Sequence, residues 1–266
     1  MTELPRRPRL LVVADAADRG AHGVAEEVAA RHGASEVVVV TPAALTTAAT
    51  WEHRIVDGRP STRITLPTGH QLDDRPAAVV LNRVRWVVPP VMASEVDRGY
   101  AVMELHALLL SWLAGLATPV VNPPTPAGLA GVQREELDLL AWLSRLGLPT
   151  RTFLLSTEVR ARSGRADAGP PPYRWSPGST GSCRALVVGD EVLDAPSEVA
   201  GLCRSVSAAV RCPLLAVDLV HEQERGWVLA GVDALPELST AAHVLAVADL
   251  VDRAVSSPAA LGRAAS

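Results

Sequence analysis

Short apolar runs alternate with segments of helical period along the first part of the chain. Residues 9–15 (RLLVVAD) form one apolar run, and residues 35–42 (SEVVVVTP) form a second. Between them, residues 21–33 place apolar side chains at helical spacing and end on Gly33, a common helix stop. Because a strand, a helix and a strand in this order favour parallel pairing, the pattern predicts a parallel sheet with helices on its faces.

The pattern then changes from helical spacing to strict alternation. Residues 51–73 alternate polar and apolar side chains around Asp57-Gly58 and Thr68-Gly69, two dipeptides typical of hairpin turns. Residues 77–84 (AAVVLNRV) are a further apolar run and predict another central strand. A long helix is expected over residues 94–117.

The second half of the chain predicts a different kind of sheet. Two hairpins are expected, and the first turns at Gly189-Asp190. Helices are expected between and around them. The expected strands and hairpins cover residues 118–122, 183–195 and 213–234, and the expected helices cover residues 134–147, 197–211 and 240–256.

One segment lacks any periodic pattern. Residues 160–182 are rich in Gly, Pro, Ser and Arg, which predicts a flexible loop or linker. The chain as a whole is expected to be an α/β protein. An N-terminal parallel-sheet domain over residues 1–125 is followed by a smaller α+β domain over residues 126–266 that carries this loop.

Composition narrows the classes of protein. The 266 residues suggest one large domain or two small ones, and 48% apolar residues with only 3% aromatic ones predict a core of Val, Leu and Ala. A formal charge of -4 gives no general case for nucleic acid. No signal peptide is visible, and the longest apolar run is broken by Pro119, so we expect a cytoplasmic protein that does not cross a membrane.

Two residue types limit the possible chemistry. The chain contains no lysine, so every formal base is an arginine, and the two side chains are not equivalent. Its three cysteines, Cys183, Cys203 and Cys212, have no metal-type spacing, and their odd number argues against a disulfide framework.

Polar side chains follow one of the predicted central strands. Asn82, Arg83 and Arg85 come at the end of the 77–84 run. Ligands of open α/β sheets bind beyond the carboxyl ends of the strands, and an arginine there can hold a carboxylate through two hydrogen bonds. The alternative is a structural role, with Arg83 paired to an acid such as Glu95 or Glu104.

Four stretches in this order resemble the ATP-grasp superfamily, in particular the carboxylate–amine ligases that modify peptides and ribosomal proteins. They are AVVLNRVRW, TPVVNPPTPAGLAG followed by WLSRLGLPT, RALVVGDEVLDA, and LLAVDLVHEQERGWVLAGVDALPELS. The resemblance implies a pre-ATP-grasp-like N-terminal domain followed by a shortened ATP-grasp-like domain. It also implies that a peptide or an acidic small molecule binds near Asn82, Arg83, Arg85 and Asn122.

The chain departs from the family where ATP would bind. Members hold the ATP phosphates with two lysines on strands that precede the RALVVGDEVLDA segment, whereas this chain has no lysine and only the 160–182 stretch there. Guanidinium or hydroxyl groups in that stretch are the remaining phosphate candidates: Arg162, Arg174 and Ser179.

The resemblance also locates a metal site with a ligand missing. Members bind magnesium with the Asp of a GvD motif and with the Glu and Asn of an EvN motif. Asp218 matches the first ligand, Gly231 stands in place of the Glu, and Asp233 stands in place of the Asn. Two carboxylates are enough for one weak cation site.

These observations lead to a function hypothesis with two alternatives. The first is a degenerate ATP-grasp-like protein without ATP turnover or cofactor, acting as a binding or accessory component in the biosynthesis of peptide or amino-acid-derived metabolites. A partner protein or a second copy of the chain is also expected to bind. The alternatives are an active ligase that uses ATP and Mg²⁺ with Arg in place of Lys, and an ATP-independent enzyme with Cys183 or a loop serine as nucleophile.

Overall fold

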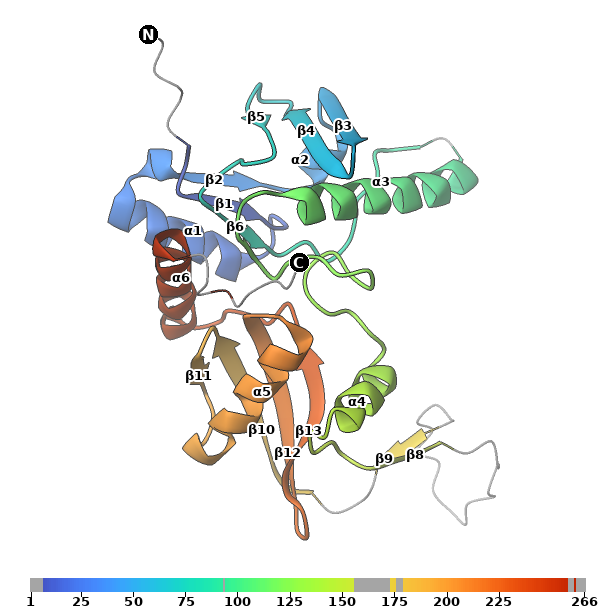
Figure 1. Ribbon diagram of the computed structural model, residues 1–266, viewed down its shortest axis with the longest axis vertical. Coiled ribbons are helices and arrows are strands. Elements are labelled where there is room, and N and C mark those ends of the chain that lie inside the picture. The colour runs from blue at the N-terminus through green and yellow to red at the C-terminus, as the bar shows by residue number, and fades with distance from the viewer. Residues whose placement is uncertain (1–6, 93, 156–172, 176–178, 258–260, 262–266) are drawn as a thin grey trace.

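The computed structural model places two four-stranded sheets one above the other, with the C-terminal helix beside their junction (Figure 1). It describes residues 7–92, 94–155, 173–175, 179–257 and 261. The mixed α/β class predicted from the sequence is confirmed.

The N-terminal sheet is parallel throughout. Its strands run in the order β2-β1-β6-β7, and each neighbouring pair is parallel. The central strand β1 pairs with both β2 and β6 over its full length, which confirms the expected strand–helix–strand unit. The four strands are β1 (Leu10–Val13), β2 (Val37–Val40), β6 (Val79–Asn82) and β7 (Val120–Val121).

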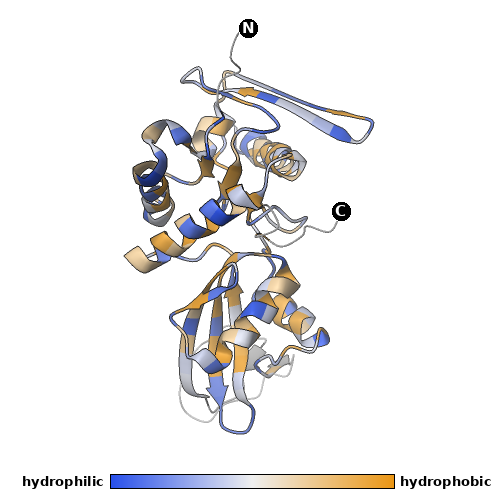
Figure 2. Cartoon of the chain, turned by 60° about the vertical axis from the view of Figure 1, so that its left-hand side comes forward, coloured by the Kyte–Doolittle hydropathy of each residue, from blue (hydrophilic) through white to orange (hydrophobic). Residues whose placement is uncertain are grey.

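Both faces of this sheet are covered, which explains its unbroken apolar runs. Successive side chains of a strand point to opposite faces, so Leu10 and Val12 pack with α1 (Arg19–His32) and α6 (Ala241–Ser256). Leu11 and Val13 pack on the other side with α3 (Glu95–Gly115). Figure 2 shows these hydrophobic strands enclosed by helices.

The predicted hairpin lies beside α3 and completes the second layer. It comprises β3 (Thr50–Val56), β4 (Arg59–Thr65) and the short β5 (Gln71–Leu72), joined in antiparallel order. Its first turn falls at Asp57-Gly58 as expected, and both residues have positive φ, 52° and 73°. The short helix α2 (Pro42–Thr46) and a 3₁₀ turn, Ala34–Glu36, flank β2.

The C-terminal sheet is antiparallel, as the two predicted hairpins require. Its strand order is β11-β10-β12-β13, and one face is covered by α4 (Glu136–Arg145) and α5 (Ala200–Val210), which follows a 3₁₀ turn over Ser197–Val199. The strands are β10 (Ser179–Val188), β11 (Glu191–Leu193), β12 (Leu214–Glu222) and β13 (Gly226–Asp233).

The structure differs from the sequence prediction inside the 160–182 segment. Tyr173–Trp175 form strand β9, which pairs with β8 (Phe153–Leu155), and the long strand β10 already begins at Ser179. The sequence predicts a loop for the Gly and Ser residues at 179–182, yet β12 offers them backbone partners, and this pairing outweighs their low strand propensity. Residues 160–172 lie outside the described part of the chain.

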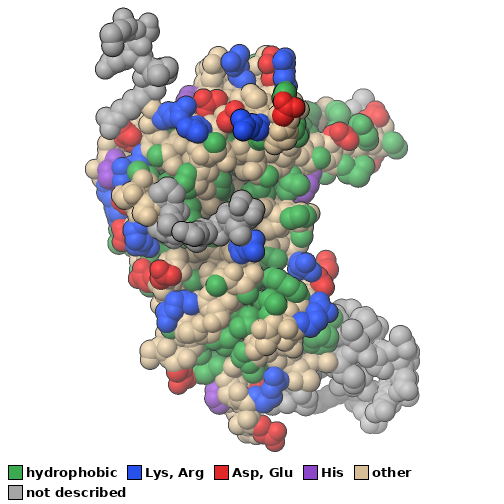
Figure 3. All heavy atoms as spheres, viewed as in Figure 1, with side chains coloured by type: hydrophobic (Ala, Val, Ile, Leu, Met, Phe, Trp, Pro, Cys, Tyr) green, Lys and Arg blue, Asp and Glu red, His purple; other side chains and the backbone are tan. Residues whose placement is uncertain are grey.

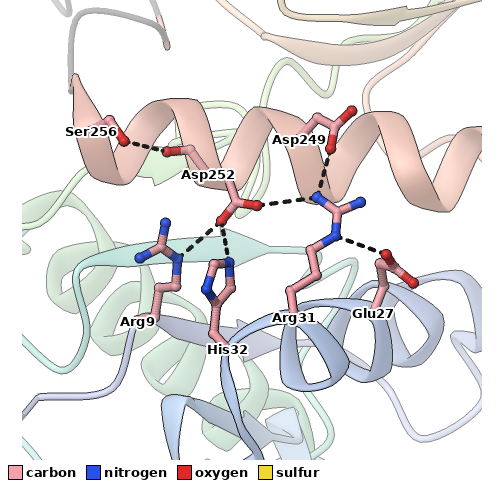
Figure 4. Close-up of polar contacts among 7 residues, drawn as sticks. All are labelled: Arg9, Glu27, Arg31, His32, Asp249, Asp252 and Ser256. Atoms are coloured by element: carbon pink, nitrogen blue, oxygen red, sulfur yellow. Dashed lines mark hydrogen bonds and ion pairs between the residues drawn. The ribbon is translucent and has the colours of Figure 1, made fainter.

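Helix α6 connects the two sheets. It comes last in sequence, yet it packs on α1, and one core joins its Val247 and Val251 to Leu186 and Val188 of β10. Polar contacts extend this packing, because Arg9 and Arg31 both donate hydrogen bonds to the Asp252 carboxylate (Figure 4). A division into domains at residue 125 stays a prediction, since α6 returns to the N-terminal sheet.

The first half of α3 projects from the body (Figures 1 and 3). Its large side chains there are exposed, with Val96, Tyr100 and Met103 each more than half accessible to solvent. In the part of the chain that the structure describes, no helix combines the length and apolar character that a membrane span requires.

Candidate functional site

A cleft of about 960 Å³ opens where the two sheets meet. The start of α1, the segment after β6, the strand β10 and the segment after β13 all contribute to its wall. Charged residues dominate the lining, with four arginines and four acids: Arg19, Arg83, Arg85, Arg184, Asp15, Asp18, Asp233 and Glu237. The cleft lies at the carboxyl end of β6, where ligands of α/β sheets usually bind.

Arg83 is a buried member of this lining. Only 4% of its side chain is exposed, and its Nε donates a hydrogen bond to Oδ2 of Asp18 at 2.6 Å. Its Nη2 donates to the carbonyl oxygen of Pro236 at 2.8 Å, while Nη1 is buried without a partner. The acid beside Arg83 is thus Asp18, in place of the Glu95 or Glu104 suggested by the sequence.

Asp18 has two roles at once. Its Oδ1 accepts a hydrogen bond from the backbone N–H of Ala21 and so caps α1, while Oδ2 holds Arg83. Next to it, Gly20 lies against the segment after β13, and an added Cβ would come within 2.5 Å of the Leu238 Cβ. The start of α1 is therefore fixed against both the β6 end and the β13 end of the cleft.

Arg85 lies nearer to the surface. Its Nη2 donates to the carbonyl oxygen of Leu235 at 3.2 Å, and its guanidinium carbon is 6.0 Å from the centre of the Trp86 ring. Trp86 itself is 60% exposed. Arg85 and Trp86 together give the cleft a charged and an aromatic group that a ligand can reach.

Asn82 and Asn122 are fully buried, and Asn122 links the two sheets. Nδ2 of Asn82 donates to the carbonyl oxygens of Asn122 and Leu129, at 2.9 and 2.7 Å. Nδ2 of Asn122 donates to the carbonyl oxygens of Leu214 and Ala234, at 2.6 and 2.7 Å, and its Oδ1 accepts from Leu214 N–H. Their amides are thus engaged by backbone, and contact with a substrate stays a prediction.

On the opposite wall, Arg184 lies between the two predicted metal ligands. Its Nη1 donates to Asp218 at 3.0 Å (Oδ1) and 2.8 Å (Oδ2), and its Nη2 donates to Asp233 Oδ2 at 2.7 Å. These side chains are partly open to water, with 50% of Arg184, 39% of Asp218 and 33% of Asp233 exposed. The structure thus places both Asp218 and Asp233 in contact with Arg184, a cation that the sequence alone did not indicate.

Strand register produces this group. Arg184 of β10 is the direct partner of Asp218 of β12, and Asp218 is the direct partner of Gly231 of β13. Directly opposed residues bring their side chains within reach on one face of the sheet. A Cβ placed on Gly231 would lie 3.3 Å from Asp218 Oδ2, so a longer side chain there would adjoin the carboxylate.

The residues around Asp218 do not fit a magnesium ion as they stand. Magnesium requires several oxygen ligands in octahedral geometry, and repulsion disfavours a guanidinium at the same place. The oxygens of Asp218 and Asp233 already accept hydrogen bonds from Arg184, and Asp233 Oδ1 also accepts from the Leu235 N–H. Among the described residues, no cluster of three or more His, Cys, Asp or Glu side chains is suited to a metal.

Neither of the two phosphate candidates that the structure describes adjoins this group. Arg162 lies outside the described residues, and Arg174 belongs to β9 of the separate two-stranded sheet. Ser179 begins β10 opposite Glu222, five positions before Arg184, a separation of about 17 Å along an extended strand. A phosphate role for any of the three stays a prediction.

All three cysteines lie in environments that raise the pKa of the thiol. Burial raises the pKa of Cys183, and the negative charge of Asp218 raises it further. Burial likewise raises the pKa of Cys203 to about 11 and that of Cys212 to about 12. Since the thiolate is the nucleophile, these environments argue against the alternative in which Cys183 carries ATP-independent chemistry.

Comparison with known proteins identifies the fold. No protein-family model matches the chain, and no curated protein matches its sequence. Solved structures do match. A RiPP-associated ATP-grasp ligase from Chryseobacterium gregarium, in complex with ADP and a leader and core peptide, has a TM-score of 0.63 at 11% identity. The match covers 92% of this chain and 96% of that one.

Two further structures agree. The macrocyclase MdnC from Microcystis aeruginosa MRC, bound with precursor peptide MdnA, has a TM-score of 0.68 at 12% identity, with 92% of this chain and 99% of that chain covered. The ATP-grasp ligase PsnB, complexed with minimal precursor, Mg and ADP, has a TM-score of 0.64 at 16% identity, with 93% and 98% covered. The resemblance to the ATP-grasp superfamily is therefore confirmed at the level of the fold.

Proposed function

We propose that this protein binds a peptide in the cleft between its two sheets, as a non-catalytic component of peptide modification that does not turn over ATP. The observation that carries the proposal is the cleft of about 960 Å³, whose walls hold guanidinium groups at the carboxyl end of β6. Binding pockets for small ligands typically measure about 300–1,000 Å³, so a short peptide segment fits this space.

The lining suits a peptide with acidic side chains. Arg85 is partly accessible and can bind a carboxylate through two N–H groups, while Trp86 and Leu235 offer apolar contact beside it. Arg83 lines the same wall and is held in place by its hydrogen bond to Asp18. The three similar structures named above contain leader, core or precursor peptides, which supports a peptide partner over an acidic small molecule.

We propose that ATP is not turned over because the charged groups that phosphoryl transfer needs are lacking. Phosphoryl transfer requires cations around the phosphates and a metal that bridges them. The chain has no lysine, and the carboxylates expected to hold the metal are engaged by Arg184. In this group of residues the one cation, Arg184, is bound to the carboxylates, so the group offers neither a free cation for a phosphate nor free ligands for a bridging metal.

Calorimetry tests both parts of the proposal. The protein is titrated with an Asp- and Glu-containing peptide and, separately, with its Asn- and Gln-containing counterpart. We expect the acidic peptide alone to bind, and Arg85→Ala to weaken its binding by about tenfold or more, the typical effect of losing a hydrogen bond to a charged group. Arg54→Ala, in the exposed hairpin, is the matched control and leaves the affinity unchanged.

Titration with Mg-ATP completes the test. No heat at millimolar nucleotide is the expected result. Binding in the micromolar range, or equal binding of the acidic peptide and its amide counterpart, would overturn the corresponding part of the proposal.

One observation favours a second candidate, the active ligase. The similar PsnB structure contains Mg and ADP, so this fold accommodates both in a relative. In this chain such an activity would use arginines in place of lysines. Peptide-dependent release of ADP or phosphate, lost without Mg²⁺, would establish the ligase in place of the binding component.

The projecting end of α3 is a second surface at which a partner is expected to bind. Val96, Tyr100 and Met103 are exposed there, and exposed apolar side chains gathered in one place are typical of contact surfaces. Light scattering distinguishes the two partners expected from the sequence. A dimer that Tyr100→Glu dissociates supports the homodimer, whereas a monomer at high concentration leaves only a partner protein.

A further inference from the structure

The group formed by Arg184, Asp218 and Asp233 is built by the fold. The three residues lie on the three adjacent strands β10, β12 and β13, and backbone pairing fixes their register. Neighbouring residues of the same strands, Ala185 and Val217, face the core under α5, so the charged group lies on the opposite face, toward the cleft. The contact is therefore more than a chance meeting of long surface side chains.

The guanidinium satisfies both carboxylates together. Nη1 reaches both oxygens of Asp218 and Nη2 reaches Asp233, so one guanidinium donates charge-assisted hydrogen bonds to both carboxylates. The remaining oxygen, Asp233 Oδ1, accepts from the Leu235 N–H. All four carboxylate oxygens thus face N–H donors, and one positive charge offsets the two negative ones.

Gly231 occupies the position at which the resemblance to ATP-grasp proteins implies a further metal ligand. Gly231 lies directly opposite Asp218 and contributes no side chain, and a Cβ there would lie 3.3 Å from Asp218 Oδ2, so a side chain would fit only if that carboxylate shifted slightly. A divalent cation would find two carboxylates there, with a guanidinium already between them.

We propose that the guanidinium of Arg184 takes the place of a divalent cation at this site, so that the two carboxylates are neutralised without metal. This inference concerns the cation alone and does not depend on peptide binding. Arg184 is then a permanent cation that binds the same two carboxylates that a metal would need.

Titration with Mn²⁺ tests the proposal, because Mn²⁺ shares the oxygen preference of Mg²⁺ and its binding is visible in water-proton relaxation. The wild-type protein is expected to show no specific site at millimolar Mn²⁺. Arg184→Gln removes the positive charge and exposes two adjacent carboxylates, so we expect it to bind Mn²⁺ at least about tenfold more tightly than wild type.

Two variants control for the specificity of that gain. Arg184→Gln combined with Asp218→Asn is expected to lose the new site, because one carboxylate remains. Arg134→Gln frees only Asp138 from its ion pair and is expected to gain no site. Adding Gly231→Glu to Arg184→Gln supplies a third carboxylate and is expected to tighten Mn²⁺ binding further.

Circular dichroism of each variant confirms that it is folded before titration. Specific Mn²⁺ binding by the wild-type protein, or no gain in a folded Arg184→Gln variant, would overturn the proposal. Because this titration contains no peptide and no nucleotide, its outcome does not affect the peptide-binding proposal. A failure to bind peptide in calorimetry likewise does not affect the Mn²⁺ result.

Discussion

Two arginine–aspartate groups line the same cleft and differ in how far water reaches them. Arg83 and Asp18 are enclosed by the start of α1 and the segment after β13, whereas Arg184 and its two aspartates lie half-open on the C-terminal sheet. Removing one partner of a buried pair leaves a charge without compensation, but exposed pairs contribute little to stability. The buried Arg–Asp pair is therefore expected to stabilise the fold, whereas the exposed group on the other wall mainly balances local charge.

The largest effect is expected at Asn122, a buried side chain that links the N-terminal sheet to the C-terminal sheet. Asn122→Ala removes the hydrogen bonds to the backbone of Leu214 and Ala234, and leaves those buried groups without partners. We expect the free energy of unfolding, measured by urea denaturation, to fall by about 4 kcal/mol.

A matched variant separates the hydrogen bonds from the backbone. Asn122 has a φ of 59°, which glycine adopts without strain, so Asn122→Gly isolates the loss of the side-chain contacts. A loss below about 1 kcal/mol in Asn122→Gly would show that the amide does not hold the sheets together.

Arg83→Met is expected to have the next largest effect. It keeps much of the side-chain volume but leaves the Asp18 carboxylate and the Pro236 carbonyl without their donor. We expect a loss of about 3 kcal/mol, in the range for breaking a buried ion pair from one side. Asp18→Asn, alone and combined with Arg83→Met, completes a double-mutant cycle, and additive losses would contradict coupling between the two residues.

Much of the fold could be predicted from the sequence because its elements are locally consistent. The LLVV run of β1 is buried on both faces, and the Asp57-Gly58 turn fixes the hairpin register, so each signal is contained within a few residues. The start of β10 could not be predicted this way. Ser179 and Gly181 have low strand propensity and are ordered by pairing with β12, a partner more than thirty residues away.

The candidate site was harder to predict for the same reason. The resemblance to the ATP-grasp motifs points to Asp218 and Asp233, but Arg184 comes from a third strand, and its position opposite Asp218 follows only from the sheet register. The acid beside Arg83 was likewise sought on α3, whereas Asp18 at the start of α1 supplies it. Sequence patterns identify which residues carry charge, and tertiary contacts decide how those charges pair.

A third group, between α1 and α6, tests the comparison at intermediate exposure. Asp252 is 26% exposed and accepts hydrogen bonds from Arg9 and Arg31 (Figure 4). Burial alone would raise the pKa of Asp252, but the hydrogen bonds from Arg31 and Arg9 together hold it below its usual range. Asp252→Asn is therefore expected to cost on the order of 1 kcal/mol at neutral pH, between the buried and the exposed group.

The pH dependence of that difference has a definite sign. A carboxyl group whose pKa is lowered by folding stabilises the folded state above its unfolded pKa of about 3.9. That contribution is lost as the pH falls through the folded pKa, so the gap between wild type and Asp252→Asn should close in acid below about pH 4. Asp249→Asn, which contacts the same Arg31 at a more exposed position, is the control and should show a smaller gap.

The smallest effect on stability is expected at Arg184, and it completes the contrast between the two walls. Arg184→Gln breaks more hydrogen bonds to carboxylates than Arg83→Met does, yet water reaches Asp218 and Asp233 and can solvate the freed charges. We expect the free energy of unfolding to change by less than about 1 kcal/mol, and the change to shrink as salt screens the pair. A salt-independent loss as large as that of Arg83→Met would mean that both walls hold the fold together, and that the number of hydrogen bonds, more than their exposure, determines what an arginine contributes here.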